Sequence, residues 1–73
     1  MRYEYRVDTD TLKKIMIDKK IKNITDFSKK SNISRNTLSK VLKGEVRPSL
    51  DVMDKITDTL DLPPELAGSI FFC

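Results

Sequence analysis

Polar and basic side chains share one face of the helix predicted to run from Ser34 to Lys43. They recur at positions i, i+1, i+4, i+5 and i+8 of that helix, and no acidic residue interrupts them: Arg35, Asn36, Ser39, Lys40 and Lys43. Residues at this spacing lie together because an α-helix turns once every ~3.6 residues. Such a face offers cations and hydrogen-bond donors, either to the phosphates of a nucleic acid or only to solvent.

Charge is unevenly distributed along the chain. Residues 20–47 carry a net charge of +6, residues 48–73 carry −4 and residues 1–19 carry +1, which gives +3 for the whole chain. A basic middle beside an acidic end polarises the surface, as expected of a phosphate binder. Solvated helix faces are the alternative explanation, since charged residues most often serve only to face water.

Several kinds of chemistry are excluded by composition. The chain has no histidine, and its one cysteine is Cys73, so it offers neither a Cys/His zinc site, an internal disulfide nor histidine acid–base catalysis. A chain of 73 residues makes one domain, too small for a deep catalytic cleft. We therefore expect no enzyme, no cofactor and no metal. The sequence has no membrane-spanning run or signal peptide, which favours a cytoplasmic protein.

Helix start and stop signals divide the chain into four or five short helices, an all-α fold. Side chains that cap helix N-termini stand at Asp8 or Thr9, Asn23, Ser34 and Ser49. Asp26 lies three residues after Asn23, close to a capping-box arrangement. Pro63-Pro64 opens a last helix. Asn32 is a predicted left-handed turn residue, and Gly44 ends the helix that starts at Ser34.

The apolar residues predicted to form the core recur at helical spacing. They are Leu12, Ile15 and Met16, with Ile17 as a further candidate; Ile24, Phe27 and the small Ser28; Leu38, Val41 and Leu42; Leu50, Met53, Ile56 and Leu60; and Leu66.

The two ends of the chain have patterns of their own. Residues 2–7 alternate between aromatic or apolar and charged side chains, which predicts a short strand or an extended arm. Near the other end stand three large apolar residues, Ile70, Phe71 and Phe72. In so small a chain they either close the core or form a dimer or partner surface.

The segment Asn23–Gly44 resembles the helix-turn-helix of the lambda repressor and Cro family, also called the XRE family, of the phage or mobile-element type. Phe27 matches the apolar position where the first motif helix meets the core, and Ser28 matches the small residue at the helix crossing. Asn32 stands in place of the usual turn glycine, and Ile33 fills the corner. The resemblance extends over residues 9–66, so residues 1–73 are expected to form a single helix-turn-helix domain with its motif at 23–44.

The resemblance also implies DNA-contacting positions. The second motif helix of this family lies in the major groove. The residues that match base-contacting positions are Arg35, Asn36 and Lys40, with Ser34 and Ser39 as secondary candidates. The phosphate-contacting candidates are Asn23, Lys22, Lys43 and Arg47. A second residue departs from the pattern: Ile24 stands where the family usually has a glutamine that braces the backbone and the recognition helix.

A Cro- or repressor-like regulator is the function that the resemblance implies. It would bind an operator in double-stranded DNA as a homodimer, with recognition helices about 34 Å apart, and act by occlusion. Two alternatives remain open. One is an antirepressor that binds a larger repressor protein through the same fold, which Ile24, the aromatic N-terminus and the apolar C-terminus leave open. The other is an antitoxin with a toxin partner.

Overall fold

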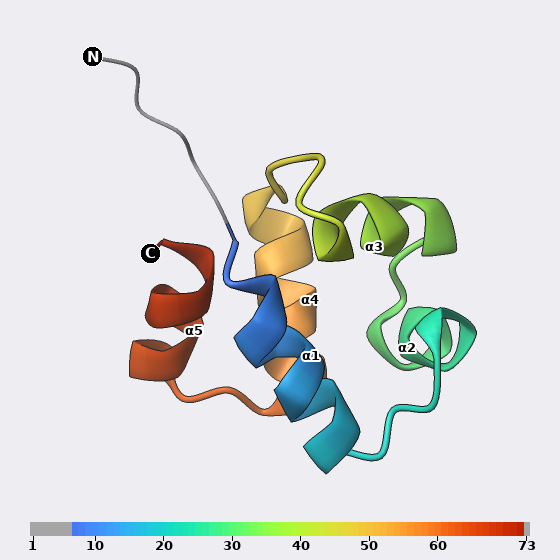
Figure 1. Ribbon diagram of the computed structural model, residues 1–73, viewed down its shortest axis with the longest axis horizontal. Helices are drawn as coiled ribbons and strands as arrows, with labels where there is room; N and C mark the ends of the chain where they lie inside the picture. Colours follow the sequence, from blue (N-terminus) through green and yellow to red (C-terminus); the bar gives the residue numbers. More distant parts are fainter. Residues whose placement is uncertain (1–6, 73) are drawn as a thin grey trace.

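The computed structural model describes residues 7–72, which form five helices and contain no strand (Figure 1). The helices are α1 (Thr9–Asp18), α2 (Ile24–Ser31), α3 (Arg35–Leu42), α4 (Leu50–Leu60) and α5 (Pro64–Phe71). The predicted all-α architecture is confirmed. Apart from Val7, the strand or arm predicted over residues 2–7 lies outside the described residues. None of the described helices is long and apolar enough to cross a membrane.

Four helices begin at the capping residues that the sequence predicts. The side chain of Asp8 accepts a hydrogen bond from the Thr11 amide, that of Asn23 from Asp26, that of Ser34 from Thr37 and that of Ser49 from Val52. Each bond satisfies a first-turn N–H group that has no partner inside the helix. The start of α5 has no such bond and instead has proline in its first turn, where the missing N–H does no harm.

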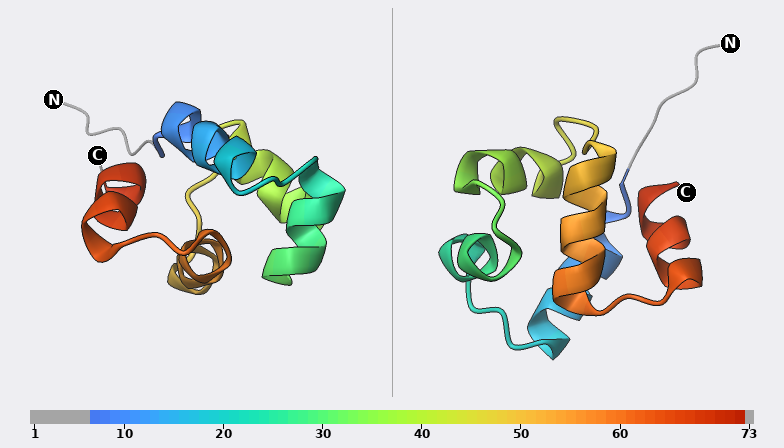
Figure 2. Two further views of the ribbon diagram at one scale, coloured as in Figure 1. Left: turned by 90° about the horizontal axis from the view of Figure 1, so that it is seen from below. Right: turned by 180° about the vertical axis from the view of Figure 1, so that it is seen from behind.

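The helices are arranged with α1 and α4 in the middle of the molecule and the other helices at its two ends. The short helices α2 and α3 lie at one end and α5 at the other, as the views in Figures 1 and 2 agree. Helix α2 packs against α3 and α4, while α1 packs against α3 and α5. The helix-turn-helix pair is therefore held from behind by α1 and α4, and α5 closes the opposite side.

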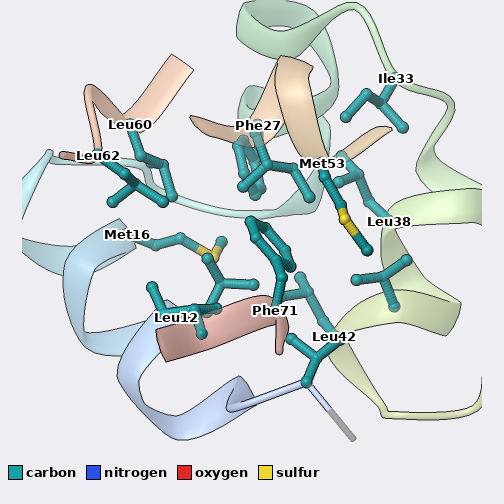
Figure 3. Close-up of a cluster of buried hydrophobic side chains, with 14 of the residues drawn as sticks. Leu12, Met16, Phe27, Ile33, Leu38, Leu42, Met53, Leu60, Leu62 and Phe71 are labelled. Carbon is teal, nitrogen blue, oxygen red and sulfur yellow. The ribbon is translucent and has the colours of Figure 1, made fainter. Parts of the chain in front are cut away.

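One continuous hydrophobic core joins all five helices (Figure 3). Its largest fully buried side chains are Phe27, Phe71, Leu12, Leu38, Ile56, Leu60, Ile70 and Val41. In Figure 3, Phe71 points into the middle of the cluster, between Leu12 and Leu42. Loop residues complete the core: Val7, Ile21, Ile33 and Leu62 are buried although none lies within a helix.

Two residues predicted to be buried are exposed. Ile17 and Leu50 both keep 73% of their surface accessible. Ile17 follows Met16 and so lies about 100° around the helix from the buried stripe of α1. Leu50 is the first residue of α4 and directly follows its N-cap, Ser49, whereas Met53 and Ile56 further along the helix are buried. Helical spacing alone overestimated the buried face at both positions.

The first and last described segments are joined. The backbone N–H of Asp8 donates a 2.8 Å hydrogen bond to the carbonyl oxygen of Ile70, and Val7 is buried beside this junction. Ile70 and Phe71 are 0% and 1% exposed and close the core, which is the first of the two roles that the sequence left open for them. Of the three C-terminal apolar residues, only Phe72 remains exposed, at 59%.

Candidate nucleic-acid interface

The turn between α2 and α3 consists of Asn32, Ile33 and Ser34. Asn32 has the predicted left-handed backbone, with φ 60° and ψ 35°, and its N–H donates to the Ser28 carbonyl at 2.9 Å. The Ser28 hydroxyl donates to the carbonyl of Ile33, while the Ile33 side chain is buried in the corner. These bonds fix the angle at which α3 leaves α2.

Helix α3 buries one face and exposes the other. Leu38, Val41 and Leu42 are buried. Four basic or amide side chains on the opposite side are exposed: Arg35, Asn36, Lys40 and Lys43. Ser39 is half-buried beside them. The structure thus brings the predicted base-contacting residues other than Ser34 onto one accessible surface of α3. The buried residues on the other face of this helix pack into the core.

Ser34 is engaged in capping. Its hydroxyl oxygen accepts from the Thr37 N–H at 3.2 Å and its hydroxyl group donates to the Thr37 hydroxyl at 2.9 Å. Both bonds hold the first turn of α3, so this side chain is engaged in starting the helix. This leaves Arg35, Asn36, Ser39 and Lys40 as the better placed candidates for contacts with bases.

Helix α3 ends at a left-handed glycine. Gly44 has φ +74°, a conformation that side chains disfavour, and its N–H donates to the Val41 carbonyl at 3.0 Å. The next amide, that of Glu45, reaches the Lys40 carbonyl at 2.9 Å. Arg47 is exposed in the loop that follows, and Pro48 beside it is buried. The loop therefore leaves α3 in a fixed direction, with Arg47 on its surface.

The start of α2 is held by a set of reciprocal bonds. The side-chain oxygen of Asn23 accepts from the Asp26 N–H at 2.8 Å. The Asp26 carboxylate in turn accepts from the Lys22 N–H at 3.1 Å, one residue earlier than in the expected capping box, and pairs with the Lys30 ammonium at 3.2 Å. The bond from Lys22, aided by Lys30, lowers the pKa of Asp26 below its ordinary value. Asn23 and Lys22 themselves are exposed.

Three of the four predicted phosphate-contacting residues lie together. Lys22, Asn23 and Lys43 line one depression, along with Ser39 from the exposed side of α3. Arg47 does not line it. The motif did not indicate Lys13, which lines the same depression from α1. No sequence signal indicated Lys13, because α1 lies outside the helix-turn-helix segment and nothing in the sequence distinguishes Lys13 from the other lysines of that helix.

Ile24 occupies the position where a glutamine was expected. Its side chain is partly buried and packs against the core while also lining this depression. An aliphatic side chain has no hydrogen-bonding group, so it cannot brace the DNA backbone or α3 as an amide would. The entry to α2 is therefore more apolar than the family pattern implies.

Comparison with known protein families matches residues 11–65 to the Cro/C1-type HTH DNA-binding domain. The match covers most of the chain and includes the whole of α2, the turn and α3, so the chain belongs to this family of DNA-binding domains. Comparisons with curated proteins and with solved structures gave no match. Among residues 7–72, no three acidic or thiol side chains are grouped to hold a metal ion.

Proposed function

We infer that this protein is a sequence-specific transcriptional regulator that inserts α3 into the major groove of double-stranded DNA. The observation that carries this conclusion is the exposed face of α3, which is basic, free of acidic residues and fixed by caps at both ends. Membership of the Cro/C1-type DNA-binding family supports it. The site is built for binding, and its described residues suggest no catalytic role.

The side chains divide into two groups by their position. Arg35, Asn36 and Lys40, with Ser39 beside them, would contact base edges, where arginine and lysine suit guanine and asparagine suits adenine. Lys22, Asn23, Lys43 and Arg47 would contact phosphates, which sets the register without reading sequence. The unbonded amide N–H groups in the first turn of α2 also favour a phosphate next to Asn23.

Repression by occlusion is the mechanism that we propose for such a domain. A homodimer would place two copies of α3 about 34 Å apart on one side of the DNA and block access to a promoter. The exposed apolar residues Leu50 and Phe72 line one groove of about 320 Å³ between α4 and α5. This groove is our candidate for the dimer surface, since α5, which forms one side of it, lies at the opposite end of the molecule from α2 and α3 (Figure 2). Such a regulator would act in the cytoplasm.

Binding to DNA from the intergenic regions next to the gene tests this function. We expect affinity to fall steeply with salt, with a logarithmic slope of about −0.9 per phosphate contacted. Replacing Arg35 and Lys40 with alanine should remove the preference for one sequence. The matched control is Lys14→Ala, which removes an exposed cation from α1. Absence of DNA binding at low salt would refute the regulator and favour a protein-binding role.

A further inference from the structure

The depression that Lys22, Asn23 and Lys43 line is a groove of about 360 Å³. It lies where α1, the start of α2 and the second half of α3 meet. Its size is at the lower end of the ~300–1,000 Å³ typical of ligand sites. Apolar side chains from all three helices and the first loop form its floor: Met16, Ile17, Ile21, Ile24 and Leu42. Polar and basic side chains form its rim: Lys13, Lys22, Asn23, Ser39 and Lys43.

The charge of the rim is entirely positive. Lys13, Lys22 and Lys43 line the groove, and no acidic residue is among the described residues that do so. The groove between α4 and α5 is the reverse, with Asp54 as its charged residue and no lysine or arginine among those described. The two apolar grooves therefore select different occupants, and the first suits a ligand that is both anionic and apolar.

Ile17 makes the apolar part of this groove accessible to a ligand. It is 73% exposed although it lies next to the buried Met16, and Ile24 contributes a second aliphatic side chain at the position where the family has a polar one. A DNA backbone offers phosphates to the lysines but no large aliphatic side chain to cover Ile17. A protein segment with aliphatic and acidic side chains satisfies both.

We propose that this groove binds an acidic amphipathic segment of a partner protein, with large aliphatic side chains on the floor and aspartate or glutamate against the lysine rim. Four groove residues, Lys22, Asn23, Ser39 and Lys43, are also those assigned to DNA, so the segment and DNA exclude each other. This last point rests on the proposed function. The partner would thus release the domain from its operator.

A labelled synthetic helix tests direct binding without DNA. The probe carries leucines at i, i+4 and i+7 and glutamates elsewhere; one control peptide replaces leucine with serine, and another replaces glutamate with glutamine. Fluorescence anisotropy should show binding of the probe and a loss of about tenfold or more for either control. Ile17→Ser should lose about tenfold, whereas Val46→Ser, which alters an exposed apolar residue outside the groove, should not.

Competition with operator DNA tests the exclusion. The Ile17→Ser protein should bind DNA as the unchanged protein does, because Ile17 is not assigned to DNA, but the probe should no longer displace it. Equal probe affinity of the Ile17→Ser and Val46→Ser proteins would overturn the proposal, as would binding that the leucines do not affect. Sedimentation would also overturn the proposal if Ile17→Ser alone lost self-association. The groove would then be occupied by a second copy of this chain. Probe binding by a protein that binds no DNA would support the groove while refuting the regulator.

Discussion

Asn23 and Asp26 stabilise the start of α2 from both directions. The Asn23 side chain accepts from the Asp26 N–H at 2.8 Å, and the Asp26 carboxylate accepts from the Lys22 N–H just before the helix. Asn23 is one of the residues proposed to contact DNA, and Asp26 bonds to the backbone of another, Lys22. We therefore expect local helix stability and DNA binding to be linked at this point, and substitutions can separate them.

Acid should weaken the fold partly through Asp26. Its pKa is lower in the folded protein than the ordinary value of about 3.9 that applies when the chain is unfolded. The carboxylate thus stabilises the fold above that ordinary pKa, and this contribution disappears as pH falls through the folded value. Urea unfolding from pH 7 into acid should show the advantage of the unchanged protein over Asp26→Asn shrinking below about pH 4. A difference independent of pH would contradict this.

Two substitutions at Asn23 should separate capping from DNA binding. Asn23→Ala removes the cap and should lower the free energy of unfolding by about 1 kcal/mol. Asn23→Asp keeps a capping oxygen and adds a negative charge that suits the helix start, so stability should be retained. The same charge repels a phosphate, so DNA affinity should fall. Unfolding by urea and DNA titration on both proteins make the comparison; full DNA affinity of Asn23→Asp would remove Asn23 from the phosphate contacts.

The left-handed residue Asn32 should tolerate glycine but not alanine. At φ 60° a Cβ atom costs roughly 1–2 kcal/mol, which asparagine tolerates better than most residues. Asn32→Ala should therefore destabilise by about 1 kcal/mol, and Asn32→Gly should be close to neutral. Thermal unfolding of the two proteins measures this, and equal melting temperatures would contradict the prediction.

At Lys20, in the loop after α1, a substitution by glycine should relieve backbone strain and so stabilise the protein. Lys20 is exposed and has φ 61°, so Lys20→Gly should stabilise the protein by up to about 1 kcal/mol. Its neighbour Lys19 has φ −86°, where glycine gives no relief, and Lys19→Gly should destabilise by roughly 0.5–1 kcal/mol. Unfolding in urea should give the two variants opposite signs.

The adjacent residues Phe71 and Phe72 should contribute very different amounts to the free energy of unfolding. Phe71 is 1% exposed, so Phe71→Ala should destabilise by about 3–5 kcal/mol, enough to unfold a domain of this size. Phe71→Leu removes less buried surface, so the protein should stay folded and its loss of stability can be measured. Phe72 is 59% exposed, and Phe72→Ala should change monomer stability by no more than about 0.5 kcal/mol. A similar effect at both positions would show that α5 is not anchored as described.

The sequence predicted the local features of the fold better than its packing. The caps at Asn23, Ser34 and Ser49 and the turn at Asn32 were predictable because each depends on one side chain and on the backbone within a few residues of it. The left-handed backbone of Lys20 gave no signal, since lysine has no preference for it.

Packing depends on distant parts of the chain. Helical periodicity placed Ile17 and Leu50 in the core, although no described helix covers them, and it could not tell which C-terminal residues turn inward. The groove beside α3 likewise depends on where α1 ends relative to α2. The DNA-contacting residues come from resemblance to the family and remain predictions.

The hydrogen bond from Asp8 to Ile70 has a consequence for how the protein folds. It joins the first and last helices, so the contacts that complete the core, those of Phe71 with α1, require the ends of nearly the whole described chain to meet. Closing so long a loop loses more chain entropy than forming α2 and α3 from neighbouring residues. The helix pair should therefore form early and the α1–α5 contact late. The rate of refolding should then respond weakly to changes in Phe71, and the rate of unfolding strongly.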